Sequence, residues 1–387
     1  MEPLVTRRLV TVIAASAAVT LTLAGCGGSS KSTSGAGGNS TAKNAKTATS
    51  AADMGGLDAL VAAAKKEGTL NVIALPPTWA NYGELISGFT AKYGIKVTST
   101  NPDGSSGDEI TAIKSLKGQS RAPDVVDVGQ SFALSGAASG LYAPYKVATW
   151  SDIPDAQKDS DGKWVNDYGG YISIGCDAKK VTSCPTSIKA LDDPQYKGKV
   201  ALNGDPTSAN AAFSAVWAAA LANGGTLDNV QPGIDFFGKL KKDGVFVPVN
   251  AKPATIESGE TPIVLDWDYL NAGYVTTFAA KGVDWKVADP SDALLPGYYD
   301  QAINASVPHP AAARLWEEYI YSDEGQNLWL KGYARPARLA AMTTAKSATP
   351  ELLAKLPAIS GTAQFPTDAQ ITAAKTVVTQ NWAKAVS

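Results

Sequence analysis

The stretch Thr261-Pro262-Ile263-Val264-Leu265-Asp266-Trp267-Asp268-Tyr269 decides the fold of this 387-residue chain. Residues 263–265 form a continuous apolar run after a proline, which is typical of a strand buried on both faces of a parallel sheet. The run then changes to alternating acidic and aromatic residues. Ligands of open α/β sheets bind beyond the carboxyl ends of the strands. We therefore expect a ligand to contact Asp266, Trp267, Asp268 and Tyr269; the alternative is a strand that ends in solvent.

Composition limits the classes of function. The chain is long enough for two domains, and 44% of its residues are apolar. Its net charge of −2 gives no reason to expect a nucleic-acid partner. The single histidine, His309, would have to serve any histidine-based metal site, dyad or triad. Because Pro310 is typical of a first helical residue, we expect His309 to start a helix rather than to serve such a site. We also expect no metal and no cofactor.

The first 26 residues indicate an export signal that is not part of the fold. Arg7 and Arg8 precede an apolar run that is shorter than the ~20 residues needed to span a bilayer. The run ends at Leu23-Ala24-Gly25-Cys26, which resembles the lipobox of bacterial lipoproteins. In that family the chain is cut before the cysteine, whose sulfur carries diacylglycerol. The resemblance implies a lipid on Cys26 and a location at the outer face of the bacterial cytoplasmic membrane; the alternative is an ordinary secretory signal.

A tether and a disulfide are expected next. Residues 27–53 contain nothing larger than Lys and no apolar residue beyond Ala, so they predict a flexible coil with a reach of roughly 30 Å. With Cys26 assigned to lipid, Cys176 and Cys184 are the remaining cysteines of an exported chain, and we expect them to form a disulfide. No other soft ligands accompany them, which argues against a metal.

The sequence after the tether predicts a first α/β unit. Apolar residues at helical spacing separate buried-strand patterns at 70–75, 95–98 and 125–128, which is a β-α-β order and implies a parallel sheet. The ends of these strands lead to polar or aromatic side chains that we expect near a ligand, namely Trp79, Ser105, Ser106 and Gln130. Ser106 and Glu109 have the spacing of a capping box, and a helix start of this kind can also bind an anion or a polar ligand.

A second α/β unit lies between two extended crossings. Residues 162–174 predict the first crossing, with turns at Asp161-Gly162 and Gly169-Gly170. The strand pattern at 199–202 leads to Thr207 and Ser208 before a helix. Residues 297–303 predict the strand that crosses back, and an amphipathic helix near 368–385 is expected to pack across the rear of both units.

This order resembles the type II solute-binding proteins of bacterial ABC importers, over about residues 57–340. The resemblance is carried by Leu75-Pro76-Pro77-Thr78-Trp79, by residues 263–269, and by Pro308-His309-Pro310-Ala311-Ala312 with Ser322-Asp323-Glu324-Gly325-Gln326. These motifs look like the branch with spermidine/putrescine-binding and ferric-iron-binding proteins. The resemblance implies an α/β fold of two lobes, each a mostly parallel sheet flanked by helices. The boundaries that we expect are signal peptide 1–26, tether 27–53, lobe 1 at 54–168 and 299–350, lobe 2 at 169–298, and C-terminal helices at 351–387.

The same resemblance implies capture of a small solute between two closing lobes, and its delivery by a monomer to the membrane subunits of a permease. Polyamine-binding relatives use carboxylates for ammonium groups and aromatic faces for methylenes. Tyr298-Tyr299-Asp300 is similar to their aromatic-x-Asp pattern, and residues 266–269 supply both residue types. We therefore expect a polyamine or a related amine.

Other ligands and other classes of protein stay open. Ferric iron is one alternative, but ferric-binding relatives carry tandem tyrosines where this chain offers only Tyr269. Tyr298 and Tyr299 are tandem, but adjacent residues on a strand face opposite ways, so they do not form the same pair. An organophosphonate or similar anion could bind at the helix starts, held by Ser105, Ser106, Thr207 and Ser208. A secreted enzyme on the same fold is a less favoured alternative, because one histidine and no free cysteine leave no base-nucleophile pair. A purely structural surface lipoprotein is the third class.

Overall fold

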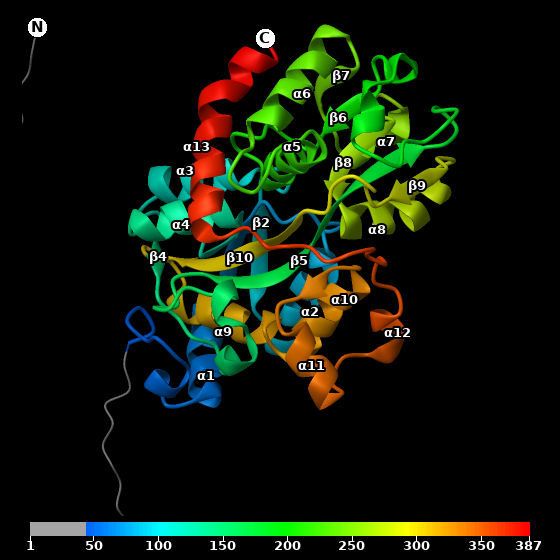
Figure 1. Ribbon diagram of the computed structural model, residues 1–387. Coiled ribbons are helices and arrows are strands. Elements are labelled where there is room, and N and C mark those ends of the chain that lie inside the picture. The colour runs from blue at the N-terminus through cyan, green and yellow to red at the C-terminus, as the bar shows by residue number, and fades with distance from the viewer. Residues whose placement is uncertain (1–43) are drawn as a thin grey trace, which may run out of the picture. The chain divides into compact units, whose positions relative to one another are not determined.

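The computed structural model describes residues 44–387 (Figure 1). The predicted signal peptide, the lipid-bearing Cys26 and residues 27–43 of the predicted tether lie outside the described residues. Residues 44–53, which we expected to belong to the tether, are instead folded against the first lobe. Ala48 is fully buried and its carbonyl accepts a hydrogen bond from Arg314 Nε at 2.8 Å, while Lys146 N donates to Thr49 O at 2.8 Å. A buried guanidinium needs such acceptors, which explains why this polar segment is ordered.

Lobe 1 combines the first part of the chain with a later helical part. Its first part contains α1 (Leu57–Glu67), β1 (Thr69–Ile73), α2 (Tyr82–Tyr93), β2 (Lys96–Thr100), α3 (Ser106–Ser115), β3 (Val125–Gly129), α4 (Gln130–Ala138) and β4 (Tyr142–Ala143). The later part contains α9 (Pro310–Ile320), α10 (Asp323–Lys331), β11 (Arg335–Pro336), α11 (Leu339–Ala345) and α12 (Pro350–Leu353). Strands β1 and β2 pair in parallel, as the β-α-β order predicts.

Lobe 2 lies between the two crossing strands in sequence. It contains β6 (Val200–Leu202), α5 (Asn210–Ala222), α6 (Gln231–Lys242), β7 (Phe246–Asn250), α7 (Pro253–Ser258), β8 (Ile263–Trp267), α8 (Asp268–Ala279) and β9 (Trp285–Ala288). Two 3-10 turns, Lys189–Asp192 and Pro194–Tyr196, lie in this lobe; three others, Ala52–Met54, Trp150–Asp152 and Asp155–Gln157, precede β5 in the chain. Strand β6 pairs in parallel with both β7 and β8.

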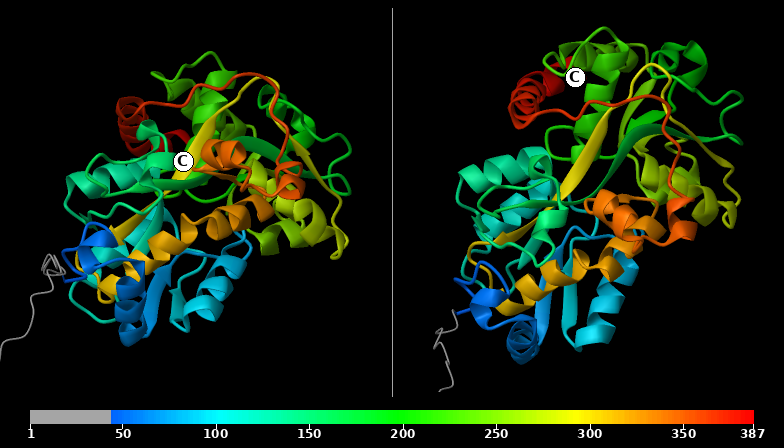
Figure 2. Two further views of the ribbon diagram at one scale, coloured as in Figure 1. Left: turned by 90° about the horizontal axis from the view of Figure 1, so that it is seen from below. Right: turned by 60° about the horizontal axis from the view of Figure 1, so that its bottom comes forward.

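The crossing strands β5 (Val165–Asp177) and β10 (Pro296–Asn304) join the lobes through one sheet of order β3-β10-β5-β8-β6-β7. All of their pairings are antiparallel. The first half of β5 pairs with β10, and its second half, from Ile172 to Cys176, pairs with β8 in lobe 2. Both predicted crossings are therefore strands, and the views in Figure 2 show them running between the two lobes.

Gly169 and Gly170 do not form the turn that we predicted; they lie inside β5. A Cβ on Gly169 would come within 2.4 Å of Gly297 O, and a Cβ on Gly170 would come within 2.2 Å of an Asp268 carboxylate oxygen. These distances are far below normal contact. The two glycines therefore allow neighbouring backbone and side chains to approach the crossing strand closely.

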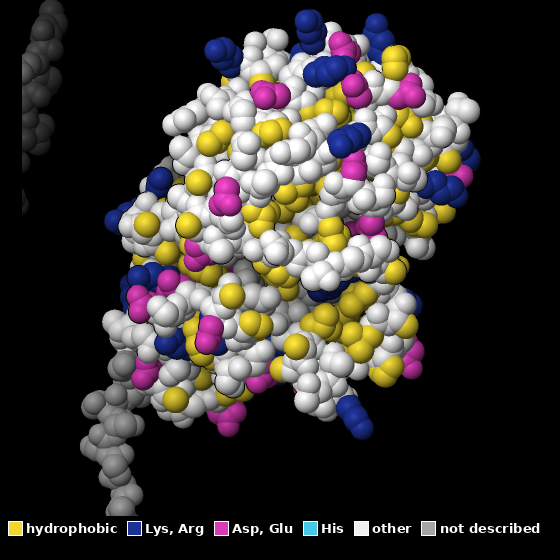
Figure 3. Space-filling view, viewed as in Figure 1, with side chains coloured by type: hydrophobic (Ala, Val, Ile, Leu, Met, Phe, Trp, Pro, Cys, Tyr) yellow, Lys and Arg dark blue, Asp and Glu magenta, His cyan; other side chains and the backbone are white. Residues whose placement is uncertain are grey.

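Helix α5 is buried on almost every side, and it packs against α6 and α13 (Asp368–Ala385) (Figure 1). Helix α13 begins and ends close to the predicted bounds, and Ile371, Val378 and Trp382 are buried along one face, as the helical spacing predicts. It packs against α6 and α5 of lobe 2 and against α4 of lobe 1. Figure 3 shows charged side chains of both signs interspersed at the far end of lobe 2, and fewer charges in the middle of this face.

Two further sequence predictions concern the cysteines and the histidine. Cys176 and Cys184 form the predicted disulfide, with Cα atoms 5.9 Å apart. His309 is the N-cap residue of α9, with Pro310 as the first helical residue, as predicted. Its Nδ1 lies 2.8 Å from Asp124 Oδ2, and this contact raises the pKa of His309.

Candidate ligand-binding site

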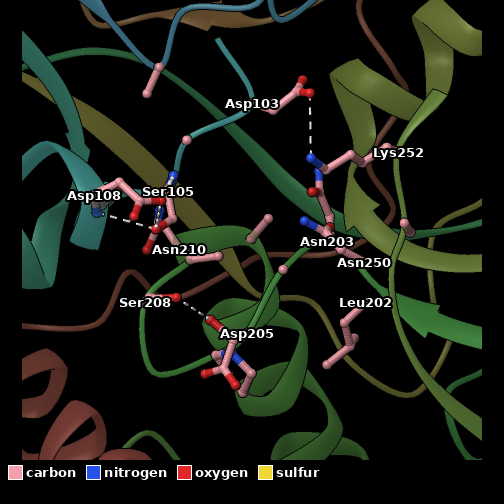
Figure 4. Close-up of a pocket in the computed structure, with 18 of the residues that line it drawn as sticks. Asp103, Ser105, Asp108, Leu202, Asn203, Asp205, Ser208, Asn210, Asn250 and Lys252 are labelled. Carbon is pink, nitrogen blue, oxygen red and sulfur yellow. Dashed lines mark hydrogen bonds and ion pairs between the residues drawn. The ribbon is translucent and has the colours of Figure 1, made fainter. Parts of the chain in front are cut away.

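A cavity of about 530 Å³ lies between the two lobes. Lobe 1 contributes the loops after β1 and β2, the start of α3, and Asp127 of β3; lobe 2 contributes the loop between β6 and α5 together with residues 246–253. The end of α13 adds Trp382 and Val386 to the wall. Figure 4 shows Ser105 and Asp108 beside Asn210, and Asp103 next to Lys252, with Asn203 and Asn250 close to that lysine.

The lobes touch each other across this cavity. Gly107 N donates to Ser208 O at 3.1 Å, and Lys252 Nζ lies 3.4 Å from Asp103 Oδ2 (Figure 4). Gly129, at the end of β3, lies so close to Asn210 that a Cβ there would be 2.2 Å from the asparagine side chain. The arrangement is therefore a closed one, in which a ligand would be held by both lobes.

The titratable side chains of the cavity wall are mostly acidic. Five carboxylates from the described part of the chain line it: Asp103, Asp108, Glu109, Asp127 and Asp205. Among residues 44–387 the only Lys, Arg or His side chain that lines it is Lys252, which pairs with Asp103. The field in the cavity therefore favours a ligand that carries positive charge.

Asp127 is the carboxylate whose geometry is best defined. Its Oδ2 accepts hydrogen bonds from Tyr82 OH at 2.7 Å and Tyr168 OH at 2.9 Å. Its Oδ1 is buried and has no hydrogen-bond partner within the described part of the chain. Burial raises the pKa of Asp127 to about 7, against the effect of the two tyrosine hydrogen bonds. A buried acceptor without a partner is costly, so a ligand that donates a hydrogen bond here would be stabilised.

Aromatic rings surround this carboxylate. Trp79 Nε1 donates to Tyr168 OH at 2.7 Å, which fixes the indole beside the cavity. The rings of Trp79 and Tyr299 meet edge to face with centroids 5.6 Å apart, and both side chains line the cavity. Tyr168 stacks on Tyr299 with centroids 5.7 Å apart. Aromatic faces next to a carboxylate suit an alkylammonium group, which combines charge with apolar methylenes.

Helix α3 is held in place by two side chains that we had assigned to its cap. The N-cap is Ser105, with Asp108 as its capping-box partner, so the predicted box of Ser106 and Glu109 is shifted by one residue. Ser106 Oγ instead accepts from Gly129 N at 3.1 Å, and Glu109 Oε2 accepts from Asp127 N at 3.0 Å. Both bonds tie α3 to β3, and Glu109 has a raised pKa because it is buried next to Asp127.

Five of the predicted ligand residues line the cavity: Trp79, Ser105, Ser106, Ser208 and Tyr299. Eight do not: Gln130, Thr207, Asp266, Trp267, Asp268, Tyr269, Tyr298 and Asp300. Gln130 instead donates to Asp368 Oδ1 of α13 at 3.0 Å.

The acidic and aromatic strand tip, residues 266–269, is buried within the protein, contrary to our expectation that a ligand would contact it. Trp267 and Tyr269 are at most 1% exposed and belong to the core. Asp266 accepts from Asn203 Nδ2 at 2.8 Å, and Asp268 pairs with Arg335 Nη1 at 2.6 Å. These contacts satisfy the carboxylates within the protein.

The two residues of the return crossing that were predicted to bind the ligand with Tyr299 also lie away from the cavity. Asp300 is fully buried and one of its oxygens is hydrogen-bonded to Asn166. The ring of Tyr298 stacks on Phe365 with centroids 5.3 Å apart. Tyr299 alone of this trio lines the cavity, because adjacent side chains on a strand point to opposite faces.

The hydroxyls at the two helix starts already have partners. Ser105 is bonded to Asp108, and Thr207 N and its hydroxyl both donate to Asp205 Oδ1. Asp108 therefore occupies donors at the start of α3. Asp205 places a carboxylate in the loop before α5, whose own first turn has no side-chain cap, and that carboxylate repels an anion.

Sequence reasoning did not place Asp127 at the cavity. It lies within Val125-Val126-Asp127-Val128, which we read only as a buried strand. A single carboxylate inside an apolar strand was the available signal, because such a group needs partners or a ligand. Asn203, Asp205, Asn210, Asn250 and Lys252 were also missed, and they lie on loops and helix starts without a motif.

Comparison with known proteins now identifies the family. Residues 120–358 match the family described as bacterial extracellular solute-binding protein. No curated protein sequence matches the chain. The fold is similar to the periplasmic binding protein AfuA from Actinobacillus pleuropneumoniae with bound fructose-6-phosphate, with a TM-score of 0.65 and 18% identity over 83% of this chain and 99% of AfuA.

Two other solved structures have the same fold and other ligands. Iron-bound HitA from Pseudomonas aeruginosa has a TM-score of 0.58 and 22% identity over 81% of this chain and 99% of HitA. The Atu4243-GABA receptor has a TM-score of 0.59 and 19% identity over 82% of this chain and 97% of the receptor. The family and these neighbours are binding proteins rather than enzymes. The chain belongs to the bacterial extracellular solute-binding proteins and has the two-lobed type II fold of the substrate-binding components of ABC importers.

Proposed function

We propose that the protein captures a small cationic amine, such as a polyamine, between its lobes and delivers it to the membrane subunits of an ABC importer. The observation that carries this proposal is the free, buried Oδ1 of Asp127 in a cavity lined by five carboxylates and one lysine. An ammonium group would donate its hydrogen bond to that oxygen. Its methylenes would lie against the rings of Trp79 and Tyr299.

The carboxylates that bind the amine differ from those of the sequence-based hypothesis. Asp266, Asp268 and Asp300 are occupied by Asn203, Arg335 and Asn166. Asp127 would bind the ammonium group instead; it lines the cavity together with Glu109, which accepts a hydrogen bond from the backbone N of Asp127. The class of ligand is retained because the cavity keeps both required components, carboxylate and aromatic ring.

An anionic ligand is disfavoured by the charges of the wall. Phosphonates or sugar phosphates would meet Asp108 at the start of α3 and Asp205 in the loop before α5, and Lys252 is already paired with Asp103. Neither helix start therefore has free donors and a positive field together.

Ferric iron is disfavoured by the tyrosines. Iron would need phenolates, but burial raises the pKa of Tyr269 and Tyr299 well above the ordinary value. Within residues 44–387 no cluster of three or more His, Cys, Asp or Glu side chains could hold a metal ion.

The same proposal includes a lipid anchor and a monomeric body. Cys26 would carry the lipid at the outer face of the cytoplasmic membrane, and residues 27–43 would connect it to the folded body that begins at residue 44. In the described part of the chain, no helix has the length and apolar character needed to cross a bilayer. Metabolic labelling with a fatty acid, lost in Cys26→Ser, tests the anchor.

A thermal-shift screen tests the ligand class. Putrescine or spermidine at a hundred times the dissociation constant should add about 2.7 kcal/mol to the free energy of unfolding. Asp127→Asn should strongly reduce the shift, because the amide cannot balance the ammonium charge. Asp300→Asn should keep it, because Asp300 faces Asn166 and not the cavity. A shift with phosphonates or ferric complexes alone would overturn the amine proposal.

A further inference from the structure

Four buried carboxyl groups lie close enough to interact electrostatically: Glu109 and Asp127, which line the cavity, and Asp167 and Asp300, which do not; they are here called the carboxylate cluster. Each is at most 5% exposed. Glu109 accepts from the backbone N of Asp127, and Gln301 Nε2 donates both to Asp167 Oδ2 at 3.1 Å and to Tyr82 OH at 2.8 Å. Tyr82 OH donates in turn to Asp127.

The carboxylate cluster contains no balancing positive charge. Among the described residues, no Lys, Arg or His forms an ion pair with any of its four members. Isolated buried carboxylates are expensive, so such groups hold protons instead. Burial is the first cause of the raised pKa of each member, and the negative charge of Asp127 raises the pKa of the other three further.

The titratable groups around Asp127 are all acids or phenols. They are Tyr82 of α2, Glu109 of α3, Asp167 and Tyr168 of β5, Tyr269 of α8, Tyr299 and Asp300 of β10, Glu317 of α9, and Tyr321 at the C-cap of α9. None of these groups can carry a positive charge that would balance an ionised Asp127. Oδ1 of Asp127 has no hydrogen-bond partner among the described residues and Asp127 lines the cavity, so a positive charge could reach it only from a ligand in the cavity.

We propose that the amine enters by exchange with a proton, so that Asp127 is a carboxylic acid in the empty closed protein and a carboxylate when an ammonium group is bound. The O–H bond of Asp127 breaks, the proton passes to water, and an ammonium N–H donates to Oδ1. One positive charge enters and one leaves, so the charge buried at the carboxylate cluster is unchanged. This inference rests on the proposed amine-binding function.

The exchange makes Asp127 a specificity determinant with a defined pH dependence. Below the pKa of Asp127 in the empty protein, about 7, each bound amine must displace one proton. The association constant should then rise about tenfold per pH unit and level off above that pKa. A neutral solute of similar size gains nothing from the ionised form and would be rejected.

Calorimetric titration with putrescine in two non-competing buffers of different ionisation enthalpy, phosphate and ACES at pH 6 and borate and Tricine at pH 8.5, measures the released protons. At pH 6 we expect close to one proton per bound amine, falling toward zero at pH 8.5. Asp127→Asn should release none and bind more weakly. Glu318→Gln should behave as the wild type, because Glu318 accepts from Tyr145 OH and Ala148 N and does not line the cavity.

Two results separate this inference from the proposed function. Putrescine binding with equal heats in both buffers would overturn proton exchange and leave amine binding intact. Absence of binding by both putrescine and spermidine would overturn both. Carbon-13 NMR of the carboxyl groups of the ligand-free protein, assigned with Asp127→Asn, gives an independent test: titration of Asp127 near its ordinary value of about 4 would overturn the exchange.

Discussion

Gly107, in the first turn of α3, brings lobe 1 within hydrogen-bond distance of lobe 2. Its N–H donates to Ser208 O, and a Cβ on it would lie 3.1 Å from Ser208 Cβ. The contact therefore depends on the absence of a side chain at this position. It also places the start of α3 against the cavity wall that Ser208 helps to form.

Gly107→Val should weaken amine binding by disfavouring closure. Overpacking of this kind costs about 1–3 kcal/mol, which corresponds to a dissociation constant roughly 5- to 150-fold higher. Calorimetry on the variant measures the loss. Gly273→Ala in α8 is the matched control, because its Cβ would meet only an ordinary contact at 4.0 Å. Affinities equal to the wild type in Gly107→Val would show that the contact has no part in closure.

At the scale of elements, helix α13 links the lobes through Lys375. Its ammonium lies 4.5 Å from the ring centre of Phe132 in α4 and 5.0 Å from that of Phe213 in α5. Nζ also donates to Pro206 O, in the loop that lines the cavity, at 3.0 Å. Because these partners belong to different lobes, the complete set of contacts requires the closed arrangement.

Lys375→Met should keep the packing of the side-chain stem and lose the cation-π and hydrogen-bond contacts. We expect a loss of roughly 1–2 kcal/mol in amine binding, because cation-π contacts contribute about 0.5–2 kcal/mol. Burial lowers the pKa of Lys375 to about 8, so the wild type should lose part of the same contribution above that pH. Lys384→Met, at an exposed position of the same helix, should bind as the wild type. An equal change in both variants would contradict a specific role of Lys375.

Helix α13 also shows why elements were easier to predict than the site. Its capping box of Thr367 and Gln370 and its buried face arise from residues close in sequence. The burial of Asp268, Asp266 and Asp300 depends on partners 67, 63 and 134 positions away. Local patterns fix helices and strands, whereas the environment of a carboxylate is decided by long-range packing.

At the scale of the whole molecule, several buried carboxyl groups make stability depend on pH. Burial raises the pKa of Asp127 and Asp266 to about 7 and that of Glu317 to about 8. A carboxyl with a higher pKa in the folded than in the unfolded chain holds extra protons when folded. Its contribution to stability is therefore complete below the unfolded value, about 4, and is lost as pH rises through the folded value.

The ligand-free protein should accordingly become less stable between pH 5 and pH 8. Each such group contributes up to about 1.4 kcal/mol per pH unit while only the folded chain holds the proton. Thermal or urea unfolding at several pH values measures the slope. Asp266→Asn should reduce the slope, because it removes one of these groups without changing the shape of the side chain. Stability that increases over this range would contradict the expected protonation.

Much of the global architecture could be predicted from the sequence. The strand run at 263–265, the crossings and the order of elements indicated two α/β lobes, and the structure has them. The position of the cavity could not be predicted, because it forms where loops of both lobes meet. Five of its lining residues, Trp79, Ser105, Ser106, Ser208 and Tyr299, could be predicted from strand ends, helix starts and the return crossing, whereas Asp127 lacks a local motif.

The most direct test of the central claim is a crystal structure of the protein with putrescine or spermidine. We expect an amine nitrogen within ~3 Å of Asp127 Oδ1, with the methylenes against Trp79 and Tyr299. An amine bound at Asp266, Asp268 or Asp300, or a cavity that excludes amines and accepts an anion at the starts of α3 and α5, would contradict the account.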